Sequence, residues 1–392
     1  MKLGDTTVAY LGRTRFRGTG RRFGIKQADR LSHLYLVGKT GVGKSTLLAT
    51  LALQDIAAGR GVAVIDPHGD LAARVNASLP PDERHRVTYL DATDPAQPFG
   101  YNPLRRVRDD KIPLAASGLL ETMRKLWSAS WGVRMEYVLR NCLYALLERE
   151  GSTLPDILRM LAHERFRKAV VARIRNPVVK DFWRMEFEKY PPRLKAEAIA
   201  PIQNKVGALL ADPMLYRLLV APPVDLHFRS LMDEDGILIV NLSRGEIGED
   251  SALVLGSLIV STLGLAAFSR ADVPEERRNP FFLYVDEFQS FTTLSFVSML
   301  SELRKYGLGI TLAHQYLGQL APEILAAALG NVGTLISFRV GAQDAPILAK
   351  EFEPTFGQED LINLPNHALY LKLMIDAAPS HPFSAEVLPA QA

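Results

Sequence analysis

Cysteine is almost absent from this chain of 392 residues, because Cys142 is the only one. A single thiol cannot form an internal disulfide or a thiolate zinc cluster. The N-terminus lacks a charged start followed by an apolar run and a small-residue cleavage site, so we expect no secretory signal peptide. Low-complexity tracts and internal repeats are also missing. These absences argue against redox and thiolate-metal chemistry and favour a folded protein of the reducing cytoplasm.

Long apolar stretches are scarce as well. The one long stretch without charge runs from Ser251 to Ser269, and its 19 residues are near the minimum for a membrane span. It is rich in glycine, serine and alanine, lacks tryptophan or tyrosine at its ends, and lies between two segments of strand character. We therefore expect a helix buried against a sheet and no integral membrane span.

The composition is otherwise that of a globular protein, with 47% hydrophobic and 23% charged residues. The length allows two domains, or one large domain with an insertion. The net charge of +3 is unevenly distributed, because residues 1–30 carry a net +6 and residues 111–225 a net +7, which leaves the remainder acidic. Two interpretations stay open for these basic segments, a solubilising surface or an electrostatic contact with a nucleic-acid backbone.

Short apolar runs that end in turns or polar clusters predict buried parallel strands, and helical patterns fall between many of them. This alternation predicts an α/β fold with a mostly parallel sheet flanked by helices. The expected strands are 34–37, 62–65, 87–90, 237–240, 281–285, 310–312, 335–338 and 369–373. The expected helices include 45–58, 252–269 and 296–305.

The strand signal disappears between about residues 113 and 223, where helical patterns are punctuated by prolines. We interpret 111–225 as an all-helical inserted domain, flanked by the two parts of the sheet domain, 31–110 and 226–392. Residues 1–30 form a separate basic segment, and the tail from Ala377 onward is expected to be irregular.

A glycine-rich segment follows the first of these strands and precedes an apolar helix. Residues 38–45 read GKTGVGKS and match every fixed position of the phosphate-binding pattern G-x-x-x-x-G-K-[ST]. Glycines let the backbone wrap around a phosphate, and N–H groups at the helix start provide an anion site. Lys44 is expected to reach the β and γ phosphates of ATP, and Ser45 to bind Mg²⁺. The predicted nucleotide-binding residues are Gly38, Lys39, Thr40, Gly41, Val42, Gly43, Lys44, Ser45 and Thr46.

The strand 281–285 ends in two adjacent carboxylates, Asp286 and Glu287, which is a Walker B pattern. Asp286 is a candidate for holding Mg²⁺, and Glu287 a candidate for accepting a proton from the attacking water. Because a kinase usually needs no such glutamate, hydrolysis is favoured over phosphoryl transfer to a metabolite. Gln315 lies just after the expected strand 310–312. It could orient water or a phosphate oxygen, but a turn residue without a catalytic role explains its position equally well.

With these elements in order, the sequence resembles the HerA/FtsK superfamily of P-loop motors, especially the type IV secretion coupling-protein and HerA-like branch. The resemblance spans about residues 31–375 and rests on VIDPHGD at 64–70, FGYNPL at 99–104, IVNLSRG at 239–245, RKYG at 304–307 with AHQ at 313–315, and GNVGT to FRVG at 330–341. It implies a RecA-like P-loop NTPase core with an all-helical insertion.

The resemblance also implies a function and further site residues. In these motors ATP lies between subunits of a homohexameric ring, and an arginine from one subunit completes the neighbouring site. Arg304 of RKYG occupies the position of that arginine finger, and Arg339 is a second candidate. The implied activity is ATP-driven translocation of DNA through backbone contacts without sequence specificity, as in a soluble conjugative coupling protein.

Alternatives remain at this point. One is a HerA-like motor that feeds DNA to a nuclease or defence effector, and another is a protein-secretion or assembly ATPase that does not grip DNA. A relaxase, a secretion channel or a nuclease is the expected kind of partner, and such a partner could recruit the cytoplasmic protein to the inner membrane. Coupling proteins usually carry N-terminal membrane helices, whereas this chain begins with a basic segment.

Overall fold

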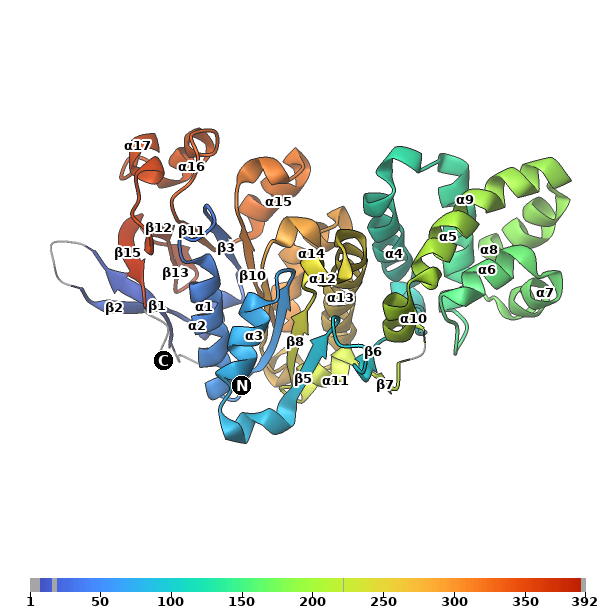
Figure 1. The fold of residues 1–392 in the computed structure, drawn as a ribbon, viewed down its shortest axis with the longest axis horizontal. Helices are drawn as coiled ribbons and strands as arrows, with labels where there is room; N and C mark the ends of the chain where they lie inside the picture. The colour runs from blue at the N-terminus through green and yellow to red at the C-terminus, as the bar shows by residue number, and fades with distance from the viewer. Residues whose placement is uncertain (1–7, 16–19, 221, 389–392) are drawn as a thin grey trace. The chain divides into compact units, whose positions relative to one another are not determined.

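The computed structural model describes residues 8–15, 20–220 and 222–388 (Figure 1). The remaining few residues of the predicted segments 1–30, 111–225 and 226–392 lie outside the described residues. The chain divides into two compact units. The first comprises the chain up to Thr93, Phe228–Ile247 and the chain from Ala266 onward, and the second comprises Asp94–His227 and Gly248–Leu265.

The first unit is built on an 11-stranded mixed sheet, in the order β2-β1-β15-β12-β11-β3-β10-β9-β4-β8-β5. Seven neighbouring strands, from β11 to β5, are parallel, and the other four are antiparallel. The parallel strands are β3 (Leu34–Val37), β4 (Gly61–Asp66), β5 (Val87–Asp91), β8 (Ile237–Asn241), β9 (Phe281–Val285), β10 (Leu308–His314) and β11 (Thr334–Ser337). The predicted α/β class and seven of the eight expected parallel strands are confirmed, whereas the eighth, 369–373, is the antiparallel strand β12 (Ala368–Lys372).

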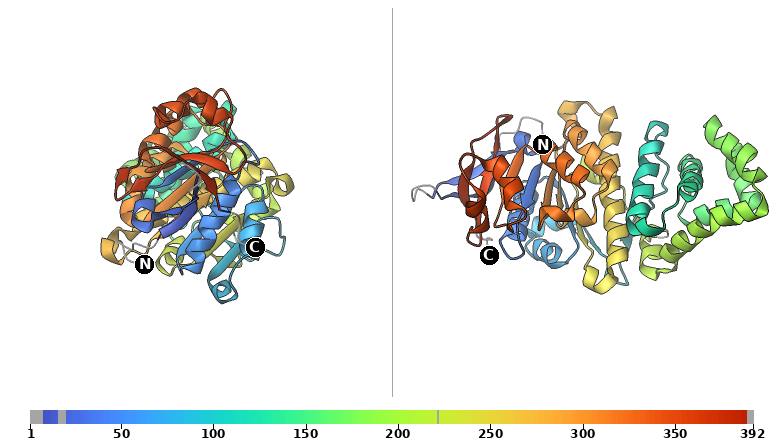
Figure 2. Two further views of the ribbon diagram at one scale, coloured as in Figure 1. Left: turned by 90° about the vertical axis from the view of Figure 1, so that its left-hand side faces the viewer. Right: turned by 90° about the horizontal axis from the view of Figure 1, so that it is seen from above.

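Helices cover both faces of this sheet, with α2 and α3 on one face and α14 and α15 on the other (Figure 2). Most connect successive strands. They are α2 (Lys44–Ala57), α3 (Asp70–Ala77), α11 (Phe228–Asp233), α12 (Arg244–Ile247), α14 (Leu294–Leu303), α15 (Pro322–Asn331), α16 (Ala345–Phe352) and α17 (Gln358–Ile362). The 3-10 turns η1 (Pro81–Arg86), η6 (Arg270–Asp272), η7 (Glu275–Arg277) and η10 (Leu317–Gln319) lie in its loops.

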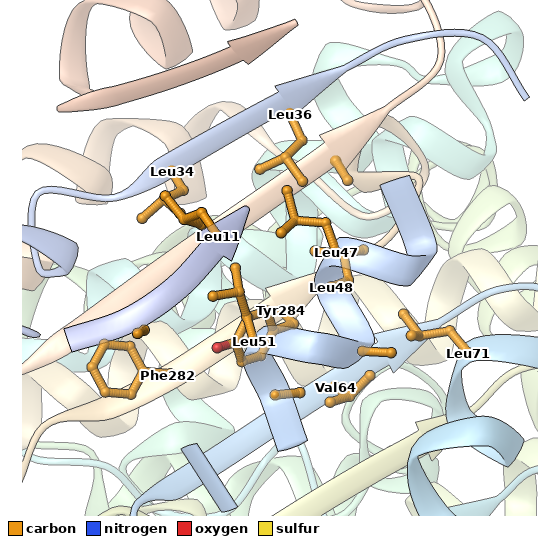
Figure 3. Packing of buried hydrophobic residues seen from close by; sticks show 14 of the residues in the cluster. Leu11, Leu34, Leu36, Leu47, Leu48, Leu51, Val64, Leu71, Phe282 and Tyr284 are labelled. Atoms are coloured by element: carbon orange, nitrogen blue, oxygen red, sulfur yellow. The ribbon is translucent and has the colours of Figure 1, made fainter. Parts of the chain in front are cut away.

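The core between α2 and the sheet arises from two periodicities. Leu47, Leu48 and Leu51 recur at helical spacing on one side of α2 and are fully buried. They face alternate residues of the strands, among them Val64 of β4 and Tyr284 of β9, as Figure 3 shows. Burial of one such leucine contributes roughly 1.5–3 kcal/mol. The P-loop helix is therefore fixed rigidly on the sheet whose strand ends carry the site.

Both ends of the chain extend the sheet. β1 (Val8–Thr14) pairs with β2 (Arg22–Lys26), and β15 (Phe383–Val387) lies between β1 and β12 (Ala368–Lys372), all antiparallel. The expectation of an irregular tail from Ala377 onward is therefore wrong. The error has a physical reason, since the strand signal of Phe383–Val387 is short and is preceded by prolines. β13 (Met374–Ile375) and β14 (Ala378–Pro379) form a small hairpin beside it.

One arginine of the basic N-terminal segment belongs to the core. Arg30 ends helix α1 (Gln27–Arg30), is 1% exposed and donates to both carboxylate oxygens of Asp55 on α2, at 2.6 and 2.8 Å. Arg60 donates to the same carboxylate at 3.0 Å, and the Tyr284 hydroxyl of β9 also contacts it. The charge of Arg30 is therefore neutralised inside the fold and is not available to a partner.

The second unit is mainly helical (Figure 1). Prolines stand at the first turn of several helices, where a missing N–H costs nothing. Its helices are α4 (Ile112–Leu126), α5 (Val133–Leu147), α6 (Pro155–Ala162), α7 (Glu164–Arg173), α8 (Pro177–Asp181), α9 (Pro192–Ala211) and α10 (Pro213–Leu219). A π-helix (Phe182–Glu186), the short turns η2 (Asp109–Lys111), η3 (Ser128–Ser130) and η5 (Phe187–Lys189), and the pair β6 (Phe99–Gly100) with β7 (Val224–Asp225) complete it.

The predicted apolar helix is α13 (Glu249–Ser269). Its length and composition would suffice to cross a membrane, but 78% of its most apolar window is buried within the protein. Burial of this kind is typical of a core helix in a folded domain. Among the described residues it is the one helix that meets the length and composition criterion.

Candidate ATP site

The P-loop lies where β3 ends and α2 begins, at the carboxyl edge of the parallel strands. Gly43 has φ 116°, and a Cβ there would come within 2.9 Å of His367 Nδ1. A Cβ on Gly38 would lie 2.5 Å from Cβ of Phe338. Both positions therefore require glycine. The loop is tied to the neighbouring strand ends, because the Lys39 amide donates to the Arg339 carbonyl at 2.9 Å.

The side chains of three predicted residues meet where this loop faces the end of β9. Lys44 is 6% exposed, and its Nζ donates to the backbone carbonyls of Gly38, at 2.5 Å, and Lys39, at 3.1 Å. The Ser45 hydroxyl donates to Oδ2 of Asp286 at 3.2 Å, which joins the start of α2 to the end of β9. Burial lowers the pKa of Lys44, against the opposing effect of the nearby acids Asp286 and Glu287.

The electrostatics of Asp286 indicate a place for a cation. Burial raises its pKa to about 6, and the negative charges of Glu287 and Asp66 add to the rise. A divalent ion beside Ser45 and Asp286 would offset this crowding of buried carboxylates. The oxygen donors are those that Mg²⁺ prefers, so the residues present fit ATP with Mg²⁺. No larger cluster of metal-ligating side chains occurs in the described part of the chain.

Glu287 directly follows Asp286 and has left-handed backbone angles, φ 47° and ψ 49°. The residue is 4% exposed, and its carboxylate accepts a hydrogen bond from Gln315 Nε2 on Oε1, at 2.9 Å. The structure thus brings Lys44, Ser45, Asp286, Glu287 and Gln315 together at one edge of the sheet. A positive φ on a non-glycine residue is uncommon and clusters at functional sites.

Arg304 lies elsewhere. It begins the turn η9 (Arg304–Tyr306) between α14 and β10, so it precedes the start of a parallel strand, whereas the P-loop follows the end of one. The two positions are at opposite edges of the sheet. Arg304 is exposed, and its charge acts on the buried His33 just before β3. Within a single chain this arginine cannot reach the phosphate site.

The second arginine candidate, Arg339, lies close to the P-loop. It follows β11 at the carboxyl edge, beside the P-loop of its own chain. Its guanidinium donates to Oδ1 of Asn366, at 2.8 Å, and to the carbonyl of Leu364, at 3.4 Å. The two arginine candidates are therefore placed very differently, one remote from the local site and one adjacent to it.

Sequence reasoning missed a second contact of Glu287. Gln289 lies in the 3-10 turn η8 (Phe288–Ser290), and its Nε2 donates to Oε2 of Glu287 at 2.5 Å. The only available signal was the polar residue two positions after the Walker B glutamate. Asp66, in the VIDPHGD motif, ends β4 and accepts hydrogen bonds from the amides of His68 and Ala72, at 2.8 and 2.9 Å. It therefore shapes the turn into α3.

Comparisons with known proteins agree with this geometry. Residues 26–261 match the family model described as helicase HerA, central domain (DUF87), which covers more than half of the chain. No curated protein sequence matches the chain. The fold is similar to the plasmid coupling protein TrwB solved with a non-hydrolysable ATP analogue, with TM-score 0.69, 16% identity and coverage of 100% of this chain and 97% of that one.

A second solved structure is similar over nearly its whole length. VirB4 of Thermoanaerobacter pseudethanolicus has TM-score 0.68 and 15% identity, with 99% of this chain and 98% of that one covered. At such low identity these two likenesses establish the fold. The matched family model, the complete P-loop and the paired Walker B acids together lead to one conclusion. The chain belongs to the HerA central-domain family and is a P-loop ATPase of the HerA/FtsK type.

Proposed function

We propose that this protein is an ATP-driven DNA translocase that works as a homohexameric ring, similar to a conjugative coupling protein. The observation that carries the proposal is the convergence of Lys44, Ser45, Asp286, Glu287 and Gln315 at one sheet edge, within a chain of the HerA family. This set contains an anion site, a cation site, a base and a polar group for the γ-phosphate.

Hydrolysis follows from the roles of these residues. The P-loop amides and Lys44 hold the β and γ phosphates, and Ser45 and Asp286 would hold Mg²⁺, which would supply charge neutralisation at the phosphate oxygens. Glu287 accepts a proton as the water oxygen bonds to the γ-phosphorus and the bond to the ADP oxygen breaks. Gln315 orients the water or a γ-phosphate oxygen. The products are ADP and phosphate.

Arg304 is proposed to act on a neighbouring subunit. Its exposed position at the sheet edge opposite to its own P-loop supports this role, since it is remote from the phosphates of its own chain and accessible to another subunit. Arg339 is the second candidate, although its guanidinium is engaged by Asn366 and Leu364 of its own chain. An ATP site completed in this way makes hydrolysis dependent on ring assembly.

DNA contact is assigned to basic side chains of the helical segment 111–225. Part of its charge is neutralised within the unit, for example in the pair of Arg140 with Glu136, at 2.8 Å, and of Arg167 with Glu188, at 2.6 Å. Other arginines are exposed, including Arg165 and Arg173 at the two ends of α7. Such exposed charges suit non-specific, salt-dependent contact with a phosphate backbone.

The deciding experiment is steady-state ATP hydrolysis with and without single- and double-stranded DNA, over a salt series. Glu287→Gln is the blank. Stimulation by DNA that fades with salt is the expected result, and it also shows which strand form is preferred. An Arg165→Ala/Arg173→Ala variant should lose part of the stimulation and keep the basal rate. A matched variant at Arg159, which pairs with Asp156 at 2.7 Å, should keep both.

A second candidate is a protein-secretion ATPase that does not grip DNA. The TM-score with VirB4 is nearly equal to that with TrwB, and this similarity supports the second candidate. ATP hydrolysis indifferent to both DNA forms at every salt concentration would select this candidate. In either case a relaxase, a secretion channel or a nuclease is the proposed kind of partner, and the protein is placed in the cytoplasm with recruitment to the inner membrane by that partner.

A further inference from the structure

The carboxylate of Glu287 is held from both sides by amide groups. Gln315 Nε2 donates to Oε1 at 2.9 Å, and Gln289 Nε2 donates to Oε2 at 2.5 Å. The two donors come from different elements, the end of β10 and the turn η8. Glu287 is 4% exposed, with both oxygens engaged by the protein and little surface open to water.

This arrangement opposes the proposed work of Glu287. A base must remove a proton from water, and a hydrogen bond donated to a carboxylate stabilises the very charge that this step neutralises. Each amide also takes one of the two acceptor directions of the oxygen that it contacts. The two amides therefore compete with a water molecule for the carboxylate of Glu287.

The two donors differ in what can remove them. Gln315 follows His314, whose carbonyl accepts from the Gly38 amide of the P-loop at 3.3 Å, so a bound γ-phosphate can attract this amide. Gln289 follows a residue that is anchored in the core. The preceding Phe288 is fully buried and packs edge-on against the rings of Tyr35 and His314, with centroids 5.8 and 5.0 Å away.

We propose that Gln289 is a positioning residue that restrains Glu287 in the resting ATPase, so that ATP alone frees only one carboxylate oxygen. Release of the Gln289 contact is a second requirement, met when DNA or a neighbouring subunit shifts the turn η8. The inference rests on the proposed ATPase function of the same site. It predicts a low basal rate of hydrolysis that rises when the Gln289 contact is released.

The test replaces the Gln289 side chain by one without a donor. Gln289→Leu and Gln289→Met are expected to raise the basal kcat about tenfold, which is about 1.4 kcal/mol of barrier, with KM for ATP unchanged. Loss of one hydrogen bond to a charged group has this order of magnitude. The fold-stimulation by DNA should shrink in proportion. Gln358→Leu, on the exposed surface of α17, is the matched control and should change neither value.

A rise in kcat cannot come from damage to the fold, so it separates restraint from a structural role. An unchanged or lower kcat in both variants, with a wild-type protein that hydrolyses ATP, would overturn the restraint and leave the proposed function standing. A wild-type rate equal to that of Glu287→Gln, with no gain in either Gln289 variant, would instead overturn the proposed function together with the restraint.

Discussion

His33 donates a hydrogen bond from Nε2 to the backbone carbonyl of Leu300, at 2.8 Å, in the last turns of α14. Nδ1 of the same ring accepts from the Ile310 amide, at 3.1 Å, so the neutral ring carries its proton on Nε2. The imidazole thereby joins the start of β3 to the segment on which Arg304 lies. The placement of the proposed arginine finger depends on a buried, neutral histidine.

Acid should therefore weaken the fold. Burial lowers the pKa of His33 to about 4 and that of His314 to about 3, both below the ordinary value near 6.5. As the pH falls from about 6.5 to 4, the unfolded chain takes up protons that the folded chain does not. The contribution of these two histidines to the free energy of unfolding should thus be full above pH 6.5 and fall by several kcal/mol toward pH 4.

Urea unfolding followed by fluorescence between pH 4 and 7.5 measures this loss. His33→Gln should reduce its slope with pH, because one of the two buried imidazoles is removed. His381→Gln, at an exposed histidine, should retain the wild-type slope. Identical slopes in the wild type and in His33→Gln would show that this ring does not drive the acid sensitivity.

Asp55 is expected to be critical for stability. Asp55→Ala leaves Arg30 fully buried without its carboxylate partner, and breaking a buried pair in this way costs roughly 3–5 kcal/mol. Thermal unfolding should show a clear drop in Tm. Asp376→Asn, which removes the charge of the exposed partner of Lys26 and suits the left-handed backbone there, serves as the comparison and should leave Tm unchanged. Similar Tm values for both variants would contradict the importance of the buried pair.

Glu287→Gln should bind ATP and fail to hydrolyse it. The amide keeps the size of the side chain but cannot accept the proton from water, so kcat should fall by roughly 10²–10⁴-fold. Binding of a fluorescent ATP analogue, measured beside phosphate release, separates the two effects. Rapid hydrolysis by this variant would remove Glu287 from the role of base.

Arg304→Ala should lower hydrolysis without abolishing nucleotide binding. The arginine lies at the edge of the sheet opposite to its own P-loop, so its loss affects only a neighbour's transition state. Mixing Arg304→Ala with Lys44→Ala subunits should restore part of the activity, since some interfaces then combine an intact P-loop with an intact arginine. Mixed rings as inactive as either parent would argue against action between subunits.

Local sequence signals suffice to predict the nucleotide site and the parallel strands that carry it. The P-loop is one continuous strand, loop and helix, and Asp286 and Glu287 directly follow a run of five apolar residues, so both signals are local. Local periodicity likewise identified the strands from 34–37 to 335–338, because buried parallel strands are nearly all apolar. These features need no knowledge of distant contacts.

The contacts between distant segments depend on how the complete chain packs. Gly12 pairs with Val387, which is far away in the sequence, and Arg30 forms an ion pair with Asp55. In neither pair can the partner be predicted from the residues next to it in the sequence. The same holds for the two amides on Glu287, since the contact of Gln315 depends on the pairing of β10 with β9. Sequence patterns record which face of an element is buried, whereas the choice of partner is made by packing of the complete chain.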